Sequence, residues 1–345
     1  MNPHYIKMMV IAMLLSLTIN AQKTEDNLWK SGRPDGHAPI SVMGDHYHSK
    51  GDVMFSYRFM RMNMENLLQG TAEITNLQAH DKGFMVTPLT MPMNMHMLGV
   101  MYGISNRFTM VAMAMYVENE MDLQMRMPTG MTREFSTSSS GFGDVKIGVL
   151  YKILNKKSQS LHAQLNLSIP TGKINAEDVT PMSAPNAIQL PYPMQIGSGT
   201  FDSDLAITYL GQAELVSWGS QLKSTLRFGE NDDTYALGNR YGLNTWFAYK
   251  TLEWLSFSAR LEGLVVESID GVNPNLNPMM VTTADTKNSG GTYVNSGLGI
   301  NILIPNGTLK DVRFGFEYAY PIYQNPNGIQ LKQQETLTFG VQYSL

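Results

Sequence analysis

The chain ends in Leu337-Thr338-Phe339-Gly340-Val341-Gln342-Tyr343-Ser344-Leu345, where apolar side chains occupy every second position. In an extended strand successive Cβ atoms point to opposite sides, so this pattern gives one apolar face and one small or polar face. The same alternation recurs upstream, for example over 310–320 and 292–304. The pattern predicts an all-β protein with strands that each present two different faces.

About twelve strands of this kind are expected, at 52–64, 95–104, 107–118, 143–153, 160–169, 201–211, 215–228, 240–250, 253–264, 292–304, 310–320 and 335–345. Short turns alternate with long loops, which are expected near 65–94, 119–142, 170–200, 229–239, 265–291 and 321–334. This regularity is typical of a transmembrane, antiparallel, up-and-down β-barrel with short periplasmic turns and long extracellular loops.

The N-terminus has the pattern of a secretory signal peptide, predicted over residues 1–21. Lys7 precedes an apolar segment that is too short to span a bilayer as a helix, and Ala21 offers a small residue for cleavage. Residues 22–51 do not alternate and are expected to form a periplasmic tail or a plug, so the barrel is predicted over 52–345. This organisation places the protein in the outer membrane of a bacterial cell, in contact with lipid.

The final strand resembles the signal that the barrel assembly machinery recognises, although it ends in Leu345 rather than in an aromatic residue. The composition limits the other partners. There are 25 Lys and Arg against 29 Asp and Glu, so no nucleic-acid partner is expected. The absence of cysteine excludes disulfides and thiolate metal sites. No catalytic motif is present, and the protein is not expected to be an enzyme.

Methionine has the most unusual distribution in the chain, with 26 residues, many of them at a spacing of two. In the first strand the methionines share a face with Arg58, and an arginine facing lipid would cost about 2–4 kcal/mol near the midplane. Their face is therefore predicted to line the lumen. The candidate lumen methionines are Met60, Met62, Met64, Met91, Met93, Met95 and Met97. Over 107–118 both faces are apolar, and the sequence does not assign them.

Thioether sulfur is a soft ligand that suits Cu(I) and Ag(I). His96 lies among the methionines, and a second group of potential ligands precedes the barrel: His37, Met43, Asp45, His46 and His48. These residues are predicted to bind soft metal, with no cofactor required. The other interpretation is equally open: methionine is a flexible apolar filler, and the rows would then line a pocket for organic compounds.

Charged and polar residues recur on the same face of the later strands. They are expected to line the lumen, where interior charges normally pair, or where they set the selectivity of a pore. The predicted lumen-lining residues are Arg58, Lys146, His162, Lys223, Arg227, Arg260, Glu262, Arg313 and Glu317.

One part of the chain resembles a known family. Leu167-Ser168-Ile169-Pro170-Thr171-Gly172-Lys173, followed by Gln195-Ile196-Gly197-Ser198-Gly199-Thr200-Phe201-Asp202, is similar to the outer-membrane transporter family named for the meta-pathway of phenol degradation. The similarity covers roughly residues 95–345 and implies a channel for hydrophobic aromatic compounds. The segments 37–46 and 56–62 depart from it and resemble a methionine-rich subgroup associated with copper handling.

Three functions follow as hypotheses. The leading one is a porin-like transporter whose methionine and histidine side chains bind or pass soft metal ions, copper above all. The second is passive uptake of small hydrophobic or aromatic solutes. The third is a structural surface barrel that transports nothing.

Overall fold

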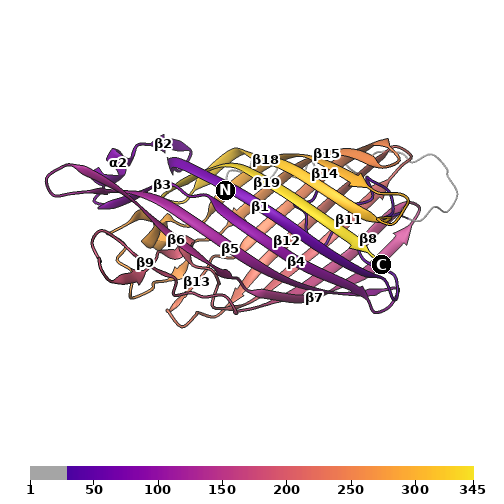
Figure 1. The fold of residues 1–345 in the computed structure, drawn as a ribbon, viewed down its shortest axis with the longest axis horizontal. Helices are drawn as coiled ribbons and strands as arrows, with labels where there is room; N and C mark the ends of the chain where they lie inside the picture. Colours follow the sequence, from indigo (N-terminus) through magenta and orange to yellow (C-terminus); the bar gives the residue numbers. More distant parts are fainter. Residues whose placement is uncertain (1–28) are drawn as a thin grey trace, which may run out of the picture.

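A closed antiparallel barrel of twelve long strands makes up most of the computed structural model, which describes residues 29–345 (Figure 1). The signal peptide predicted over 1–21 lies outside these residues. The first and last strands pair, with Phe55 opposite Tyr343, and this pairing closes the ring. The predicted up-and-down barrel is confirmed. Its strands, in ring order, are β1 (Val53–Gln69), β4 (Met93–Gly103), β5 (Phe108–Arg126), β7 (Val145–Lys156), β8 (Gln159–Ile169), β11 (Phe201–Gln212), β12 (Val216–Phe228), β14 (Arg240–Leu252), β15 (Leu255–Val266), β17 (Gly291–Leu303), β18 (Val312–Pro326) and β19 (Ile329–Ser344).

Several strands run further at the extracellular end than the sequence predicted. β5 continues to Arg126 and pairs with β6 (Thr132–Phe142), so the expected loop over 119–142 is wrong in this part. β6 consists largely of serine and threonine and has no lipid face, which is why it lacks the alternating signal. The smaller elements of this end are β2 (Ala72–Ile74), α2 (Asn76–Asp81), β3 (Val86–Thr90), β9 (Glu177–Val179), β10 (Ala187–Gln189), η1 (Tyr192–Met194), β13 (Tyr235–Ala236), β16 (Asp270–Gly271), η2 (Thr282–Ala284) and η3 (Thr286–Asn288).

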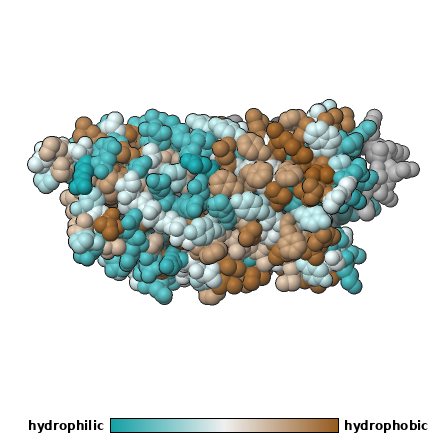
Figure 2. All heavy atoms as spheres, in the orientation of Figure 1, coloured by the Kyte–Doolittle hydropathy of each residue, from teal (hydrophilic) through white to brown (hydrophobic). Residues whose placement is uncertain are grey.

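Apolar side chains cover the outside of the barrel over roughly the half that contains the chain's C-terminus. Figure 2 shows these residues gathered on one half of the molecule, while the other half, which carries the long loops, is mainly hydrophilic. Leu98, Leu222 and Leu298 are each more than 60% exposed on this surface, as expected for side chains that face lipid. In the part of the chain that the structure describes, no helix is long and apolar enough to cross a membrane.

Ion pairs on the lumen face of the barrel join strands that are separated by one intervening strand. Arg260 on β15 is held by Glu317 on β18, with 2.6 Å between Nη2 and Oε1, and both side chains are buried. Lys223 on β12 pairs with Glu262 on β15 at 2.8 Å. Such contacts satisfy charges that the enclosed lumen cannot hydrate as bulk water would.

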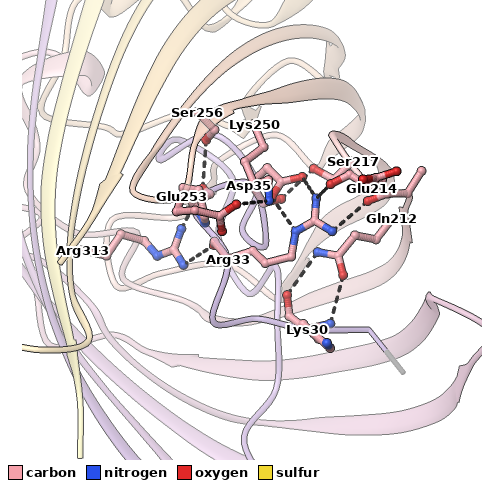
Figure 3. Close-up of polar contacts among 12 residues, drawn as sticks. Lys30, Arg33, Asp35, Gln212, Glu214, Ser217, Lys250, Glu253, Ser256 and Arg313 are labelled. Carbon is pink, nitrogen blue, oxygen red and sulfur yellow. Dashed lines mark hydrogen bonds and ion pairs between the residues drawn. The ribbon is translucent and has the colours of Figure 1, made fainter. Parts of the chain in front are cut away.

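Residues 29–51, here called the inner segment, run inside the barrel before β1 begins. Its backbone carbonyls accept hydrogen bonds from the lumen face. Arg313 Nη1 donates to the Pro34 oxygen at 3.0 Å, and Ser217 Oγ donates to the Asp35 oxygen at 2.6 Å (Figure 3). A loop without regular structure can be buried only when its polar groups find such partners. The barrel wall therefore holds the inner segment by its backbone.

Apolar contacts fix the same segment. Ala38 and Val42 pack against Trp246 and its neighbours on the lumen face. Ile40 fits a recess formed where Gly315 on β18 pairs with Gly340 on β19. A Cβ atom built on Gly315 would lie 2.9 Å from Ile40 Cβ, so neither strand has room for a larger residue here. The two glycines make the space that the isoleucine fills.

We predict that Gly315→Val loosens the inner segment without opening the barrel. Overpacking costs about 1–3 kcal/mol, so amide hydrogen exchange over 38–46 should accelerate roughly tenfold to a hundredfold. Gly32→Val is the control, because a Cβ atom there meets nothing within 4 Å. Equal exchange in the two variants would show that the recess does not hold the segment.

We also predict that Glu317→Gln lowers the free energy of unfolding by about 3 kcal/mol, because it leaves the buried Arg260 with only the more distant carboxylate of Glu262, at 3.3 Å. Urea titration followed by tryptophan fluorescence measures this loss. The matched variant is Glu253→Gln, which removes an exposed carboxylate that pairs with Lys250. Its urea midpoint should equal that of the original protein. Equal midpoints for both variants would contradict the prediction.

Candidate functional site

Seven methionines form one surface on the lumen face of three adjacent strands. The pairing between strands sets Met60 of β1 opposite Met95 of β4, and Met62 opposite Met93. Met97 of β4 lies opposite Met115 of β5. The surface, here called the methionine wall, consists of Met60, Met62, Met93, Met95, Met97, Met113 and Met115, and each of these side chains is partly buried.

The wall places thioethers at regular intervals. Directly opposite residues on paired strands have Cβ atoms about 4.5–5.5 Å apart. Residues two apart on one strand are separated by about 6.6 Å, since the rise is about 3.3 Å per residue. Each thioether, a flexible side chain with three rotatable bonds, therefore has others within reach across and along the strands. The arrangement provides a continuous row of soft donors.

A second set of methionines has a different environment at the extracellular end. Met91, Met121 and Met125 are fully buried among Val86, Leu123 and other apolar side chains. The set, here called the extracellular methionine cluster, contains Met64, Met91, Met121, Met125, Met127 and Met194. Its members pack as ordinary core residues. Two of the predicted metal ligands, Met64 and Met91, belong to this cluster and not to the methionine wall.

His96 does not accompany the methionines. It pairs with Phe59 in the register of β1 and β4, and both side chains lie on the outer face of the barrel. Its Nδ1 atom lies 2.8 Å from the hydroxyl of Tyr57 on the same face. The prediction that His96 joins the methionine ligands is therefore wrong. The cause is its even position in a strand whose odd positions, Met95 and Met97, face the lumen.

The inner segment brings together four of its five predicted ligands, His37, Asp45, His46 and His48. His46 Nδ1 lies 2.9 Å from Asp45 Oδ1, and His37 Nδ1 lies 3.5 Å from Asp45 Oδ2. The rings of His37 and His46 are 4.0 Å apart between centroids, and those of His46 and His48 are 4.9 Å apart. All four side chains, here called the histidine cluster, are at least nine-tenths buried. Met43 is separate from them, because its sulfur contacts Arg58.

Burial controls the charge of this cluster. Loss of solvent lowers the pKa of His37 well below its ordinary value, and it lowers the pKa of His48 to about 3. Both imidazoles are therefore neutral near pH 7. Burial opposes ionisation of Asp45, but the facing His46 and His37 rings hold the pKa of its carboxyl below the usual range. The cluster therefore combines the neutral imidazoles of His37 and His48 with a carboxylate.

One cavity of about 330 Å³ connects the two sets of donors in the lumen. Its lining includes Asp45 and His46 from the inner segment together with Met54, Met101 and Met113 from the barrel. Across the ring the same cavity meets charged residues, among them Lys146, Asp204, Lys223, Arg227 and Arg240. An ion or small molecule in this cavity therefore touches sulfur on one side and charged groups on the other.

The predicted lumen-lining residues all lie on the inside of the barrel. Lys146 pairs with Asp204 at 2.6 Å, Arg227 pairs with Asp202, and His162 Nε2 lies 2.8 Å from the Gly44 carbonyl oxygen. Arg58, Arg313, Lys223, Glu262, Arg260 and Glu317 make the contacts given above.

The sequence did not identify every residue of the site. Met113 and Met115 were left unassigned because β5 is apolar on both faces, and only its register with β4 shows which face meets the lumen. Met54 and Met101 also line the lumen cavity and were not among the candidate ligands. Met54 is an even number of residues from Met60, as Met101 is from Met97, and this spacing along one face was the available signal.

Comparison with solved structures places the barrel among outer-membrane proteins. An outer-membrane channel from Pseudomonas putida F1 superimposes with a TM-score of 0.60 and 13% identity, covering 89% of this chain and 100% of that one. A FadL homologue of Pseudomonas aeruginosa gives a TM-score of 0.44 at 8% identity, covering 85% and 90%. The porin NanC gives 0.42 at 10% identity, covering 86% and 100%. The first of these supports the fold, and the other two scores are too low to add to it.

No match was found among curated proteins. A family model, in contrast, matches residues 100–332, which is more than half of the chain. The match agrees with the resemblance seen around Pro170-Thr171-Gly172, whereas the methionine-rich copper subgroup stays a prediction. The protein has the fold of an outer-membrane β-barrel, and it belongs to the family described as "Putative MetA-pathway of phenol degradation".

Proposed function

We propose that this outer-membrane channel binds and passes soft metal ions, Cu(I) foremost, along its methionine wall. The observation that supports this most directly is the register of β1, β4 and β5, which faces Met60 with Met95 and Met62 with Met93 on the lumen side. If the methionines served only to fill apolar volume, nothing would require their thioethers to lie opposite one another on neighbouring strands.

The chemistry of the wall suits transit. Thioethers are neutral, soft donors, and they favour Cu(I) and Ag(I) over the hard cations Na⁺, K⁺ and Mg²⁺. Because several lie within reach of one another, an ion can exchange one sulfur for the next without returning to bulk water. Passage requires binding that is strong enough for entry and spread over several sites so that the ion also leaves.

The wall runs along the lumen from the extracellular end toward the cavity. β1 alone presents lumen methionines from Met62 through Met60 to Met54, a length of about 26 Å at roughly 3.3 Å per residue. At the inner end the cavity lined by Met54 and Met101 reaches His46 of the inner segment. A soft ion that enters at the extracellular end has donors over this whole length.

A second candidate function is passage of small hydrophobic or aromatic compounds. The family description names phenol degradation, and a flexible methionine surface also suits apolar ligands. This function requires apolar volume alone, whereas the first requires sulfur. Leucine has a similar volume and lacks sulfur, so substitution by leucine separates the two.

The test compares two variants of the refolded, detergent-solubilised barrel. In the first, Met60, Met62, Met93, Met95 and Met97 are changed to Leu. In the second, the same number of thioethers is removed from the extracellular methionine cluster, at Met64, Met91, Met121, Met125 and Met127. Each protein is titrated with Cu(I) under a competing chelator. We expect the first variant to lose affinity at least a hundredfold and the second to bind as the original protein does.

Other results would contradict the proposal. Equal Cu(I) binding by all three proteins would show that the wall does not supply the ligands. An equal loss of Cu(I) affinity in both variants would show that binding depends on the number of thioethers and not on their position. In either case liposome uptake of phenol, unchanged by the leucine substitutions, would favour the hydrophobic-solute function.

A further inference from the structure

The histidine cluster offers a different kind of site from the methionine wall. His37, Asp45 and His46 each present one ligand atom, and these three atoms lie within 4.8 Å of one another. The donors are two imidazoles and a carboxylate, with no sulfur among them. Imidazole and carboxylate suit divalent first-row ions such as Zn²⁺ and Cu²⁺, whereas thioether prefers Cu(I).

Three ring nitrogens of the cluster have no hydrogen-bond partner among the described residues. They are His37 Nδ1, His46 Nε2 and His48 Nε2, and the side chains of His46 and His48 are more than nine-tenths buried. A buried polar atom without a partner costs about 1–3 kcal/mol. Histidines that served only to pack the lumen would be expected to donate or accept at both nitrogens. These nitrogens instead remain available as ligands.

We propose that His37, Asp45 and His46 bind a divalent first-row transition-metal ion, Zn²⁺ or Cu²⁺, that cross-links the inner segment inside the lumen. The fourth position can be taken by His48, whose ring lies next to that of His46. Structural sites of this class are normally four-coordinate, so the set is sufficient.

The position of the ligands gives the site its effect. The ligands lie on both sides of the stretch 38–44, with His37 before it and Asp45 and His46 after it. This stretch contains a turn in which the Val42 amide donates to the Pro39 carbonyl oxygen. An ion bound to both sides closes this stretch into a loop. Since the ion binds only when the two sides approach each other, occupancy stabilises the arrangement seen here. Metal therefore holds the inner segment in place across the lumen.

His46 and Asp45 also line the lumen cavity, so an ion can reach them from inside the barrel without unfolding the segment. The site does not depend on the function proposed for the methionine wall, because its ligands and its preferred ions are different. A protein that passed hydrophobic solutes would carry the same site.

The test titrates the full-length refolded barrel with Zn²⁺ and, separately, Cu²⁺, each against a chromophoric chelator. The double variant His37→Gln/His46→Gln keeps polar side chains but removes two ligands. His80→Gln/His96→Gln is the matched control, because it removes two histidines that lie away from the cluster, one on α2 and one on the outer face of β4. We expect one ion per chain for the original protein and the control, and at least a hundredfold weaker binding for the double variant.

Two further measurements guard against misfolding. Asp45→Asn changes a single atom of the carboxylate and should weaken binding about tenfold. Hydrogen exchange over 37–48 should slow on addition of Zn²⁺ in the original protein and the control, but not in the double variant. Absence of stoichiometric binding, or equal binding by the double variant, would overturn the proposal and identify the cluster as a hydrogen-bond network.

The methionine-to-leucine variant of the wall separates this site from the proposed function. We expect that variant to retain its divalent ion while losing Cu(I). Loss of the divalent ion from the wall variant would overturn the assignment to the histidine cluster. Retention of the divalent site together with unchanged Cu(I) binding would contradict only the function of the wall.

Discussion

Lipid gives the backbone no hydrogen-bond partner, and the rest of this structure depends on that constraint. Every strand must pair on both sides, so the sheet closes where β1 meets β19. Closure in turn gives each strand a lipid face and a lumen face. The alternation at the C-terminus reflects this division directly, because Phe339 and Tyr343 face out while Thr338 and Gln342 are buried inside. Function can then be carried only by the lumen face and the loops.

The lumen face divides into regions of different chemistry. β1, β4 and β5 present thioethers, while the later strands present ion pairs such as that of Arg260 with Glu317. The inner segment lies between these regions and is held by both. Its backbone carbonyl oxygens accept hydrogen bonds from Arg313, and its Ile40 side chain fills the space beside Gly315 and Gly340. The barrel lines the lumen cavity with methionines and charged side chains, and the inner segment adds a histidine to this lining.

Most of the fold could be predicted from the sequence, because lipid and lumen impose opposite demands on alternate residues. The extensions of β5 and the whole of β6 could not, since strands beyond the membrane need no apolar face. The site was less predictable. Spacing placed Met60 and Met95 on the lumen side, and the same alternation places His96 on the outer face. The burial of Met91, in contrast, depends on contacts between distant loops. The approach of His37 to His46 depends on how the inner segment turns inside the barrel.

The central claim is that sulfur in the lumen serves as a ligand rather than as packing. Copper K-edge X-ray absorption on the Cu(I)-loaded, full-length barrel tests it most directly, because the nearest scatterers identify the donor atoms. We expect a nearest shell made of sulfur alone, as for thioether coordination in the methionine wall. A nearest shell of nitrogen and oxygen without sulfur would contradict it.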